Sequence, residues 1–173
     1  MMKCIFFDRD GVINKRIIGS YVKHFSEFEL NMKILPLLKF CDNHNFLKII
    51  ITNQQGIAKE YMTLEEVDLV HNQMNHLLFS NYGVKRFDSI FIASEFENSP
   101  PFRRKPSAKM IFEAKEKHHI NLGLSFMIGD SETDIVAGNN ANLKTIFYSD
   151  EELDIADFCS NEINVIIEFI KNN

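Results

Sequence analysis

The sequence predicts an α/β fold, a three-layer sandwich in which helices cover both faces of a central, mainly parallel sheet. Two observations predict it. Short apolar runs alternate with segments whose apolar residues recur at helical spacing, which is the pattern of successive strand and helix units. The runs are apolar almost throughout, which is typical of parallel strands that are buried on both faces.

Five strands are predicted from these runs. They cover residues 4–7, 47–52, 89–93, 125–129 and 145–148. Two capping-box patterns mark helix starts, one at Thr63 and Glu66 and one at Ser149 and Glu152. Helices are expected over residues 32–45, from about residue 64 to residue 79, after a capping Ser107, from about Thr133, and at the end of the chain with an apolar face of Val165, Ile166, Phe169 and Ile170.

Length, charge and cysteine content limit the possible functions. A chain of 173 residues fits one domain covering residues 1–173. Its net charge of −5 argues against nucleic-acid binding. No apolar run approaches the roughly 20 residues that cross a membrane, so we expect a cytoplasmic protein. The three cysteines lack any zinc-binding spacing, and no structural zinc is expected.

Polar residues follow four of the predicted strands at the point where each strand ends. They are Asp8 and Asp10 after the first, Thr52 and Asn53 after the second, Lys105 before the helix that follows the third, and Asp130 and Asp134 after the fourth. In a doubly wound sheet these ends converge on one crevice. Carboxylates bind hard cations such as Mg²⁺, and lysine and hydroxyl groups hold phosphate oxygens. The set predicts metal-assisted phosphoryl transfer.

Each of these residues, taken alone, also has an ordinary structural explanation. Thr52 could end its strand in a turn, and Lys105 could be a solvated loop charge. Asp130 and Asp134 could cap the following helix, since carboxylates favour helix N-termini. Such residues occur at all four strand ends, and this coincidence favours a phosphoryl-transfer site over four separate structural roles.

The motifs resemble those of the haloacid dehalogenase-like (HAD) superfamily of phosphatases, in the same order and over nearly the whole chain. They are Asp8-Arg9-Asp10-Gly11-Val12-Ile13-Asn14, Thr52-Asn53-Gln54, Lys105-Pro106 and Gly129-Asp130-Ser131-Glu132-Thr133-Asp134. The resemblance implies a Rossmann-like HAD fold. The segments between the motifs leave no room for a folded cap domain, so loops 14–28, 56–62 and 94–104 are expected to supply specificity.

The resemblance also implies the roles of the acidic residues. Asp8 would be the nucleophile that forms an aspartyl-phosphate. Asp10 would protonate the leaving oxygen and then act as base toward water. The Asp8 and Asp130 side chains and the Asp10 backbone carbonyl would bind Mg²⁺, while Asp134 would support the metal or the lysine.

The remaining motif residues are expected to bind phosphate or substrate. The resemblance assigns Thr52, the Asn53 backbone and Gln54 to this role, and Lys105 to stabilising charge on the nucleophile and phosphoryl group. Arg103 and Arg104 form a basic cluster that suits a second phosphate or a sugar hydroxyl. Arg104 is the better candidate because it adjoins Lys105. The histidines receive no role.

Within the capless members, the motifs are similar to the D-glycero-D-manno-heptose 1,7-bisphosphate phosphatases. The resemblance therefore implies Mg²⁺-dependent hydrolysis of a sugar phosphate, D-glycero-D-manno-heptose 1,7-bisphosphate, to a heptose monophosphate in the synthesis of nucleotide-activated heptose. Histidinol-phosphate phosphatases share much of the pattern. A phosphoacceptor receiver domain is the alternative from another class, but its acceptor aspartate would follow the third strand, where Ala93 and Ser94 stand.

One loop departs from the resemblance. Better-known relatives carry a structural zinc loop of cysteines and a histidine before the Arg-Lys-Pro motif. Here residues 94–102 contain neither residue type, so they cannot form that site. The two prolines and two phenylalanines of this loop are expected to stiffen and pin it instead.

Overall fold

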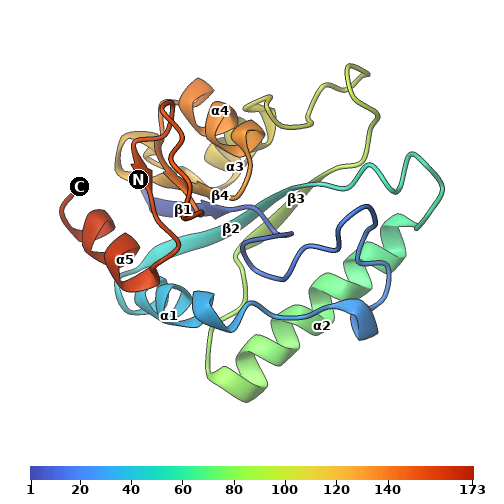
Figure 1. Cartoon of the computed structure of the whole chain (residues 1–173), viewed down its shortest axis with the longest axis horizontal. Helices are drawn as coiled ribbons and strands as arrows, with labels where there is room; N and C mark the ends of the chain where they lie inside the picture. Colours follow the sequence, from blue (N-terminus) through green and yellow to red (C-terminus); the bar gives the residue numbers. More distant parts are fainter.

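The centre of the computed structural model, which describes residues 1–173, is a six-stranded sheet (Figure 1). The strands are β1 (Lys3–Phe7), β2 (Phe46–Asn53), β3 (Ser89–Ala93), β4 (Phe126–Gly129), β5 (Lys144–Phe147) and β6 (Phe158–Cys159). Their order is β3-β2-β1-β4-β5-β6, and every neighbouring pair is parallel. The predicted α/β fold around a parallel sheet is confirmed.

Helices form a layer on each face of this sheet. They are α1 (Leu35–Asn43), α2 (Leu64–Tyr82), α3 (Lys109–His118), α4 (Glu132–Asn140) and α5 (Ile163–Lys171), and short 3₁₀ turns lie at Phe25–Glu27, Met32–Ile34 and Leu122–Leu124. Figure 1 shows α1, α2 and α5 on one side and α3 and α4 on the other. Strand side chains alternate between the two cores: Ile5 and Phe7 pack toward α1, and Cys4 and Phe6 toward α3.

The start and end of α2 follow from local sequence as expected. The Thr63 hydroxyl accepts the Glu66 N–H at 3.2 Å, and the Glu66 carboxylate accepts the Thr63 N–H at 2.8 Å. Gly83 ends the helix with a φ of 65°, a left-handed conformation that glycine adopts without steric cost. At α3, by contrast, Ala108 is the N-cap residue, and Ser107 only accepts the Lys109 N–H at 3.3 Å.

The C-terminal region differs from the prediction. Ser149 and Glu152 open no helix: the Ser149 hydroxyl accepts the Glu151 N–H at 3.1 Å, and the next helix begins only at Ile163. The unpredicted β6 is only two residues long, too short to show a periodic pattern. The Asp157 carboxylate holds the segment before it against β5 by accepting the Thr145 N–H at 2.7 Å. On α5 Ile166 is buried, whereas Val165 is half exposed, so Val165 does not belong to the apolar face.

The sheet brings the ends of β1, β2 and β4 together. Phe7 lies opposite Ile50 of β2 and Ile128 of β4, so the residues after it emerge between two parallel neighbours. Strands β1 to β3 form one half of the sheet and β4 to β6 form the other, so the strand order reverses between β1 and β4. Ligands bind at this position in open α/β sheets. Loops, and no folded cap, connect β1 to α1 and β3 to α3. No helix combines the length and the apolar character needed to cross a bilayer.

Candidate active site

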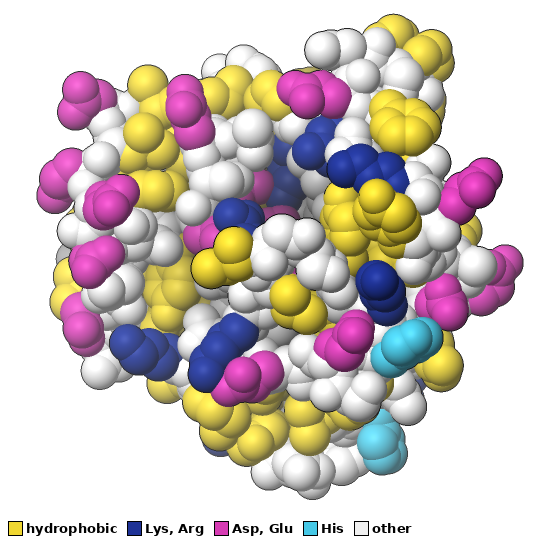
Figure 2. Space-filling view, turned by 45° about the vertical axis from the view of Figure 1, so that its right-hand side comes forward, with side chains coloured by type: hydrophobic (Ala, Val, Ile, Leu, Met, Phe, Trp, Pro, Cys, Tyr) yellow, Lys and Arg dark blue, Asp and Glu magenta, His cyan; other side chains and the backbone are white.

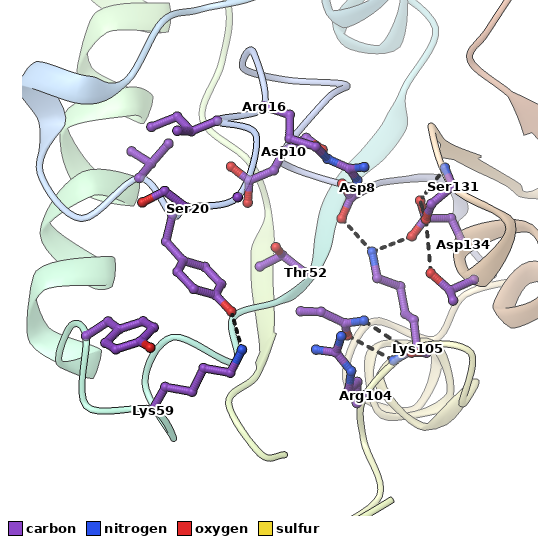
Figure 3. A pocket seen from close by; sticks show the side chains of 17 residues that line it. Asp8, Asp10, Arg16, Ser20, Thr52, Lys59, Arg104, Lys105, Ser131 and Asp134 are labelled. Carbon is purple, nitrogen blue, oxygen red and sulfur yellow. Dashed lines mark hydrogen bonds and ion pairs between the residues drawn. The ribbon is translucent and has the colours of Figure 1, made fainter. Parts of the chain in front are cut away.

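A polar cavity of about 550 Å³ lies at the carboxyl ends of the central strands. Figure 2 shows it as a hollow in which acidic and basic side chains gather, and Figure 3 shows its lining from close by. The predicted residues that line it are Asp8, Asp10, Thr52, Asn53, Arg104, Lys105 and Asp134. Asp130 contacts the lining residue Arg16, and Gln54 is fully buried against Asp10 and Thr52.

Lys105 is the cation at the base of the cavity. Its Nζ lies 2.5 Å from Asp8 Oδ1 and 2.6 Å from Asp134 Oδ1, and it donates to the Ile51 carbonyl at 2.9 Å (Figure 3). Asn53 fixes the backbone at this point, because its amide oxygen accepts the Lys105 N–H at 2.9 Å and its amide nitrogen donates to the Lys105 carbonyl at 3.2 Å. Burial acts to lower the Lys105 pKa, but Asp134 and Asp8 outweigh it and raise the pKa to about 12.

Asp134 both caps α4 and supports Lys105, two roles that the sequence analysis had offered as alternatives. One carboxylate oxygen pairs with Lys105, and the other accepts the Ser131 N–H and hydroxyl at 3.1 Å and 2.6 Å, which caps α4. Gly129 makes room for it, since a Cβ at Gly129 would lie 2.1 Å from the Asp134 Cβ. Asp134 therefore holds the lysine in place from the start of a helix.

Asp8 lies in an environment that is rich in negative charge. Burial is the main cause that raises its pKa, to about 7; Lys105 opposes the shift, and Asp134 and Asp10 add to it. Burial also raises the pKa of Asp130 to about 6, against the effect of Arg16. Lys105 and Arg16 together balance only two of the three carboxylates of Asp8, Asp130 and Asp134, so the cluster keeps a negative charge that a cation would neutralise.

The carboxylate oxygens of Asp8, Asp130 and Asp134 lie within 4.8 Å of one another. Close approach of Asp130 requires Gly11, because a Cβ there would lie 1.9 Å from an Asp130 oxygen, and its φ is 109°. The Arg16 guanidinium donates to Asp130 Oδ1 at 2.9 Å and to the Asp10 carbonyl at 3.3 Å, so these two oxygens face one cation. An all-oxygen donor set of this kind fits Mg²⁺.

The Asp10 carboxylate is held from the buried side of the loop after β1. It accepts two hydrogen bonds from Arg9, at 3.0 and 2.8 Å, one from Asn14 at 2.9 Å and one from Gln54 at 2.8 Å. Burial acts to raise the Asp10 pKa, but Arg9 and the hydrogen bonds of Asn14 and Gln54 outweigh it and lower the pKa. Gln54 also donates to the Thr52 hydroxyl at 2.9 Å, so it orients side chains instead of facing the cavity. Sequence reasoning gave Arg9 and Asn14 no part in the site.

The two arginines of the basic cluster have different environments. Arg103 lies against α3, where it makes a bidentate contact with Glu113 and donates to the Ile92 carbonyl. Arg104 lines the cavity. The choice of Arg104 over Arg103 agrees with this placement, and Arg103 is a structural residue.

The loop before Arg103 is not pinned by its phenylalanines, and that expectation was wrong. Phe96 and Phe102 are both about half exposed. The buried Glu95 carboxylate holds the loop instead, by accepting the backbone N–H groups of Arg103 and Arg104 at 2.5 and 2.8 Å. The sequence around Glu95 has no pattern from which this role could be predicted.

Loops 14–28 and 56–62 form the wall opposite Arg104. They contribute Arg16, Tyr21, Lys59 and Tyr61 to the lining. Lys59 Nζ lies 3.5 Å from the Tyr21 hydroxyl, and the Tyr21 and Tyr61 rings are 6.3 Å apart. The wall combines aromatic surface with positive charge, which suits a sugar that carries a second phosphate.

The chain is similar to several known proteins. A family model described as HAD-hydrolase-like matches residues 102–161. A D-glycero-beta-D-manno-heptose-1,7-bisphosphate 7-phosphatase of Helicobacter pylori is 37% identical over 142 residues, which are 82% of this chain and 80% of that protein. A D-glycero-alpha-D-manno-heptose-1,7-bisphosphate 7-phosphatase of Campylobacter jejuni is 32% identical over 178 residues. This match covers 98% of this chain and 96% of that protein.

A solved structure also has the same fold. D,D-heptose 1,7-bisphosphate phosphatase from B. bronchiseptica, complexed with magnesium and phosphate, superposes with a TM-score of 0.85 at 21% identity. The match covers 99% of this chain and 100% of that one. At this identity the likeness shows the fold alone.

Proposed function

The chain belongs to the haloacid dehalogenase-like phosphatases, and from this premise we propose that it removes the 7-phosphate of a D-glycero-D-manno-heptose 1,7-bisphosphate. The observation that carries the proposal is the contact of Lys105 with Asp8 at the base of a cavity whose rim is cationic. The names of the relatives support the substrate. Three free cysteines support a reducing, cytoplasmic location.

In the first step an Asp8 carboxylate oxygen attacks phosphorus and the bond to the sugar oxygen breaks. Lys105 and the Thr52 hydroxyl hold the phosphoryl oxygens and stabilise their charge. In the substrate complex Asp10 carries a proton and gives it to the leaving sugar oxygen, so the sugar departs as an alcohol. The products of this step are the dephosphorylated carbon-7 hydroxyl and a phosphorylated Asp8.

In the second step the Asp10 carboxylate accepts a proton from water as that water attacks the phosphorus. The bond between phosphorus and Asp8 breaks, inorganic phosphate leaves, and Asp8 and Asp10 return to their starting forms. Mg²⁺, held by the Asp8 and Asp130 carboxylates and the Asp10 carbonyl, supplies charge neutralisation on the phosphoryl oxygens when it is bound.

The cationic side chains around the cavity indicate a substrate with two phosphate groups. Arg16, Lys59 and Arg104 face the cavity, and the transferred phosphoryl group needs only Lys105 and Thr52 among the side chains. The other cations suit the anomeric phosphate, which stays on the product. Histidinol phosphate has no second phosphate, and its amine would meet these positive charges unfavourably.

The experiment that tests this function is phosphate release with Mg²⁺ across a substrate panel. The panel holds both anomers of heptose 1,7-bisphosphate, heptose 7-phosphate and histidinol phosphate. We expect kcat/KM for one bisphosphate anomer to exceed that for the monophosphates by roughly 10²-fold, since a site built for a charged group rejects analogues that lack it. A preference for histidinol phosphate would contradict the proposal.

A further inference from the structure

Arg9 is the largest side chain in the protein that is fully buried. It is not among the residues that line the cavity, so it does not reach the substrate. Its terminal nitrogens contact two residues: one guanidinium nitrogen donates to both oxygens of Asp10, and the other lies 3.1 Å from His71 Nε2. Buried arginines are rare unless they are paired, and this one is paired with the proposed acid–base residue.

His71 connects this arginine to α2. A guanidinium can only donate, so the contact requires His71 Nε2 to accept and the imidazole to be neutral. His71 is itself buried, and burial and Arg9 lower its pKa to about 3. The side chain thus presents a fixed acceptor behind Arg9, on a helix whose start is fixed by its capping box.

The Asp10 carboxylate has little freedom to rotate in this setting. Arg9 contacts both of its oxygens, while Asn14 and Gln54 each contact one. Proton transfer to a leaving oxygen requires the acid within hydrogen-bond reach in a defined direction. A misplacement of about 1 Å can reduce a rate by roughly 10²-fold.

We propose that Arg9, held by His71, is a positioning residue that directs the Asp10 carboxyl toward the leaving oxygen of the substrate. The inference rests on the proposed phosphatase function. It assigns a role in proton transfer to a buried pair that neither touches the substrate nor lines the cavity. A merely structural role would instead affect all substrates alike.

The leaving group separates the two roles. A sugar alkoxide must be protonated as it departs, whereas p-nitrophenolate leaves without a proton. Loss of positioning at Asp10 should therefore lower kcat/KM, which covers the steps up to departure of the leaving group, for a sugar phosphate and largely spare kcat/KM for p-nitrophenyl phosphate. Hydrolysis of phosphorylated Asp8 also uses Asp10, but it follows this step and is common to both substrates. General structural damage should lower both rates by the same factor.

The test compares kcat and KM of Arg9→Met, Arg9→Lys, His71→Phe and His71→Gln on heptose 1,7-bisphosphate and on p-nitrophenyl phosphate. We expect Arg9→Met to lower kcat/KM on the sugar phosphate by about 10²-fold, the range of general acid catalysis, with a far smaller loss of kcat/KM on p-nitrophenyl phosphate. His71→Phe should show the same pattern more weakly. His71→Gln should restore activity, because its amide oxygen can accept from Arg9.

Lys48→Met is the matched control, since it removes another buried cation that pairs with Asp42 and has no contact with Asp10. This variant should change kcat/KM by the same factor on both substrates. Equal losses of kcat/KM on both substrates in every Arg9 and His71 variant that folds would overturn the inference, and Arg9→Lys and His71→Phe keep this outcome accessible if Arg9→Met does not fold. A wild-type protein that releases phosphate from neither substrate would instead refute the proposed function, and this inference with it.

Discussion

At the scale of the residue, the site depends on which charges are buried and what neutralises them. Asp8, Asp134 and Lys105 are all buried, and the lysine contacts both carboxylates. The count within this group leaves one negative charge in excess, and Asp130, which pairs with Arg16, lies beside it. Burial is the main cause that raises the pKa values of Asp8 and Asp130, and repulsion from the neighbouring carboxylates adds to it.

His71 supplies a stability prediction at the same scale. Its pKa falls from 6.5 to about 3 on folding, mainly through burial. Between these values the unfolded chain binds a proton that the folded protein does not. Stability from this group should therefore be complete above about pH 6.5 and fall as the pH drops toward 3, at up to ~1.4 kcal/mol per pH unit.

The measurement is urea unfolding of the wild type and of His71→Gln at pH 7 and pH 5. Glutamine can accept from Arg9 and does not titrate, so the variant should lose about 2 kcal/mol less than the wild type over this interval. The same loss in both proteins would mean that His71 does not titrate on unfolding in this range.

At the scale of the element, the loops around the cavity are fixed by single charged contacts. Glu95 accepts the N–H groups of Arg103 and Arg104 and so sets where Arg104 enters the cavity. Glu95→Gln removes an anionic acceptor and should loosen this loop. We expect KM for heptose bisphosphate to rise by roughly 5-fold with kcat nearly unchanged, since charge-assisted hydrogen bonds are about twice as strong as neutral ones.

Steady-state kinetics checks this, with Glu97→Gln on the exposed part of the same loop as control. The control should match the wild type. A drop in kcat without a change in KM in the Glu95 variant would place its effect on chemistry and would contradict the role given to the loop.

The loop after β1 carries a second prediction, because Arg16 contacts two of the proposed Mg²⁺ ligands. Metal binding must compete with the guanidinium for the Asp130 carboxylate. Arg16→Ala should therefore tighten Mg²⁺ binding by about 2- to 5-fold, since a partly exposed ion pair contributes under ~1 kcal/mol. Calorimetric titration of the substrate-free protein with Mg²⁺ measures this directly.

Lys15→Ala is the neighbouring control, because Lys15 pairs with Glu29 on the exposed surface. It should leave Mg²⁺ affinity unchanged. Weaker Mg²⁺ binding in the Arg16 variant would show that Arg16 assists the metal instead of competing with it.

At the scale of the whole molecule, the parallel sheet converts distant segments into one site. Asp8 and Lys105 are 97 positions apart in the sequence, yet their side chains are in contact. Such convergence could be predicted, because polar residues that follow successive buried strands must meet at one edge of a parallel sheet. The strands themselves were predictable for the same reason, since their apolar runs are long enough to show burial on both faces.

Other features could not be read from the sequence, for definite physical reasons. The strand β6 depends on contacts of Asp157 with Thr145 of β5, which no local pattern encodes. The pairing of Arg9 with His71 joins residues 62 positions apart, and a lone histidine on a helix gives no signal of its partner. The Glu95 contacts similarly depend on the folded shape of a loop.

The most direct test of the account is Mg²⁺-dependent phosphate release from heptose 1,7-bisphosphate by the wild type and by Asp8→Asn, each shown to be folded by circular dichroism. Asparagine keeps the size of Asp8 but cannot attack phosphorus to form the acyl phosphate. We expect the wild type to release one phosphate per substrate molecule, and the variant to lose at least about 10³-fold in rate. Substantial Mg²⁺-dependent release by folded Asp8→Asn would contradict the central claim that Asp8 is the nucleophile of a phosphatase.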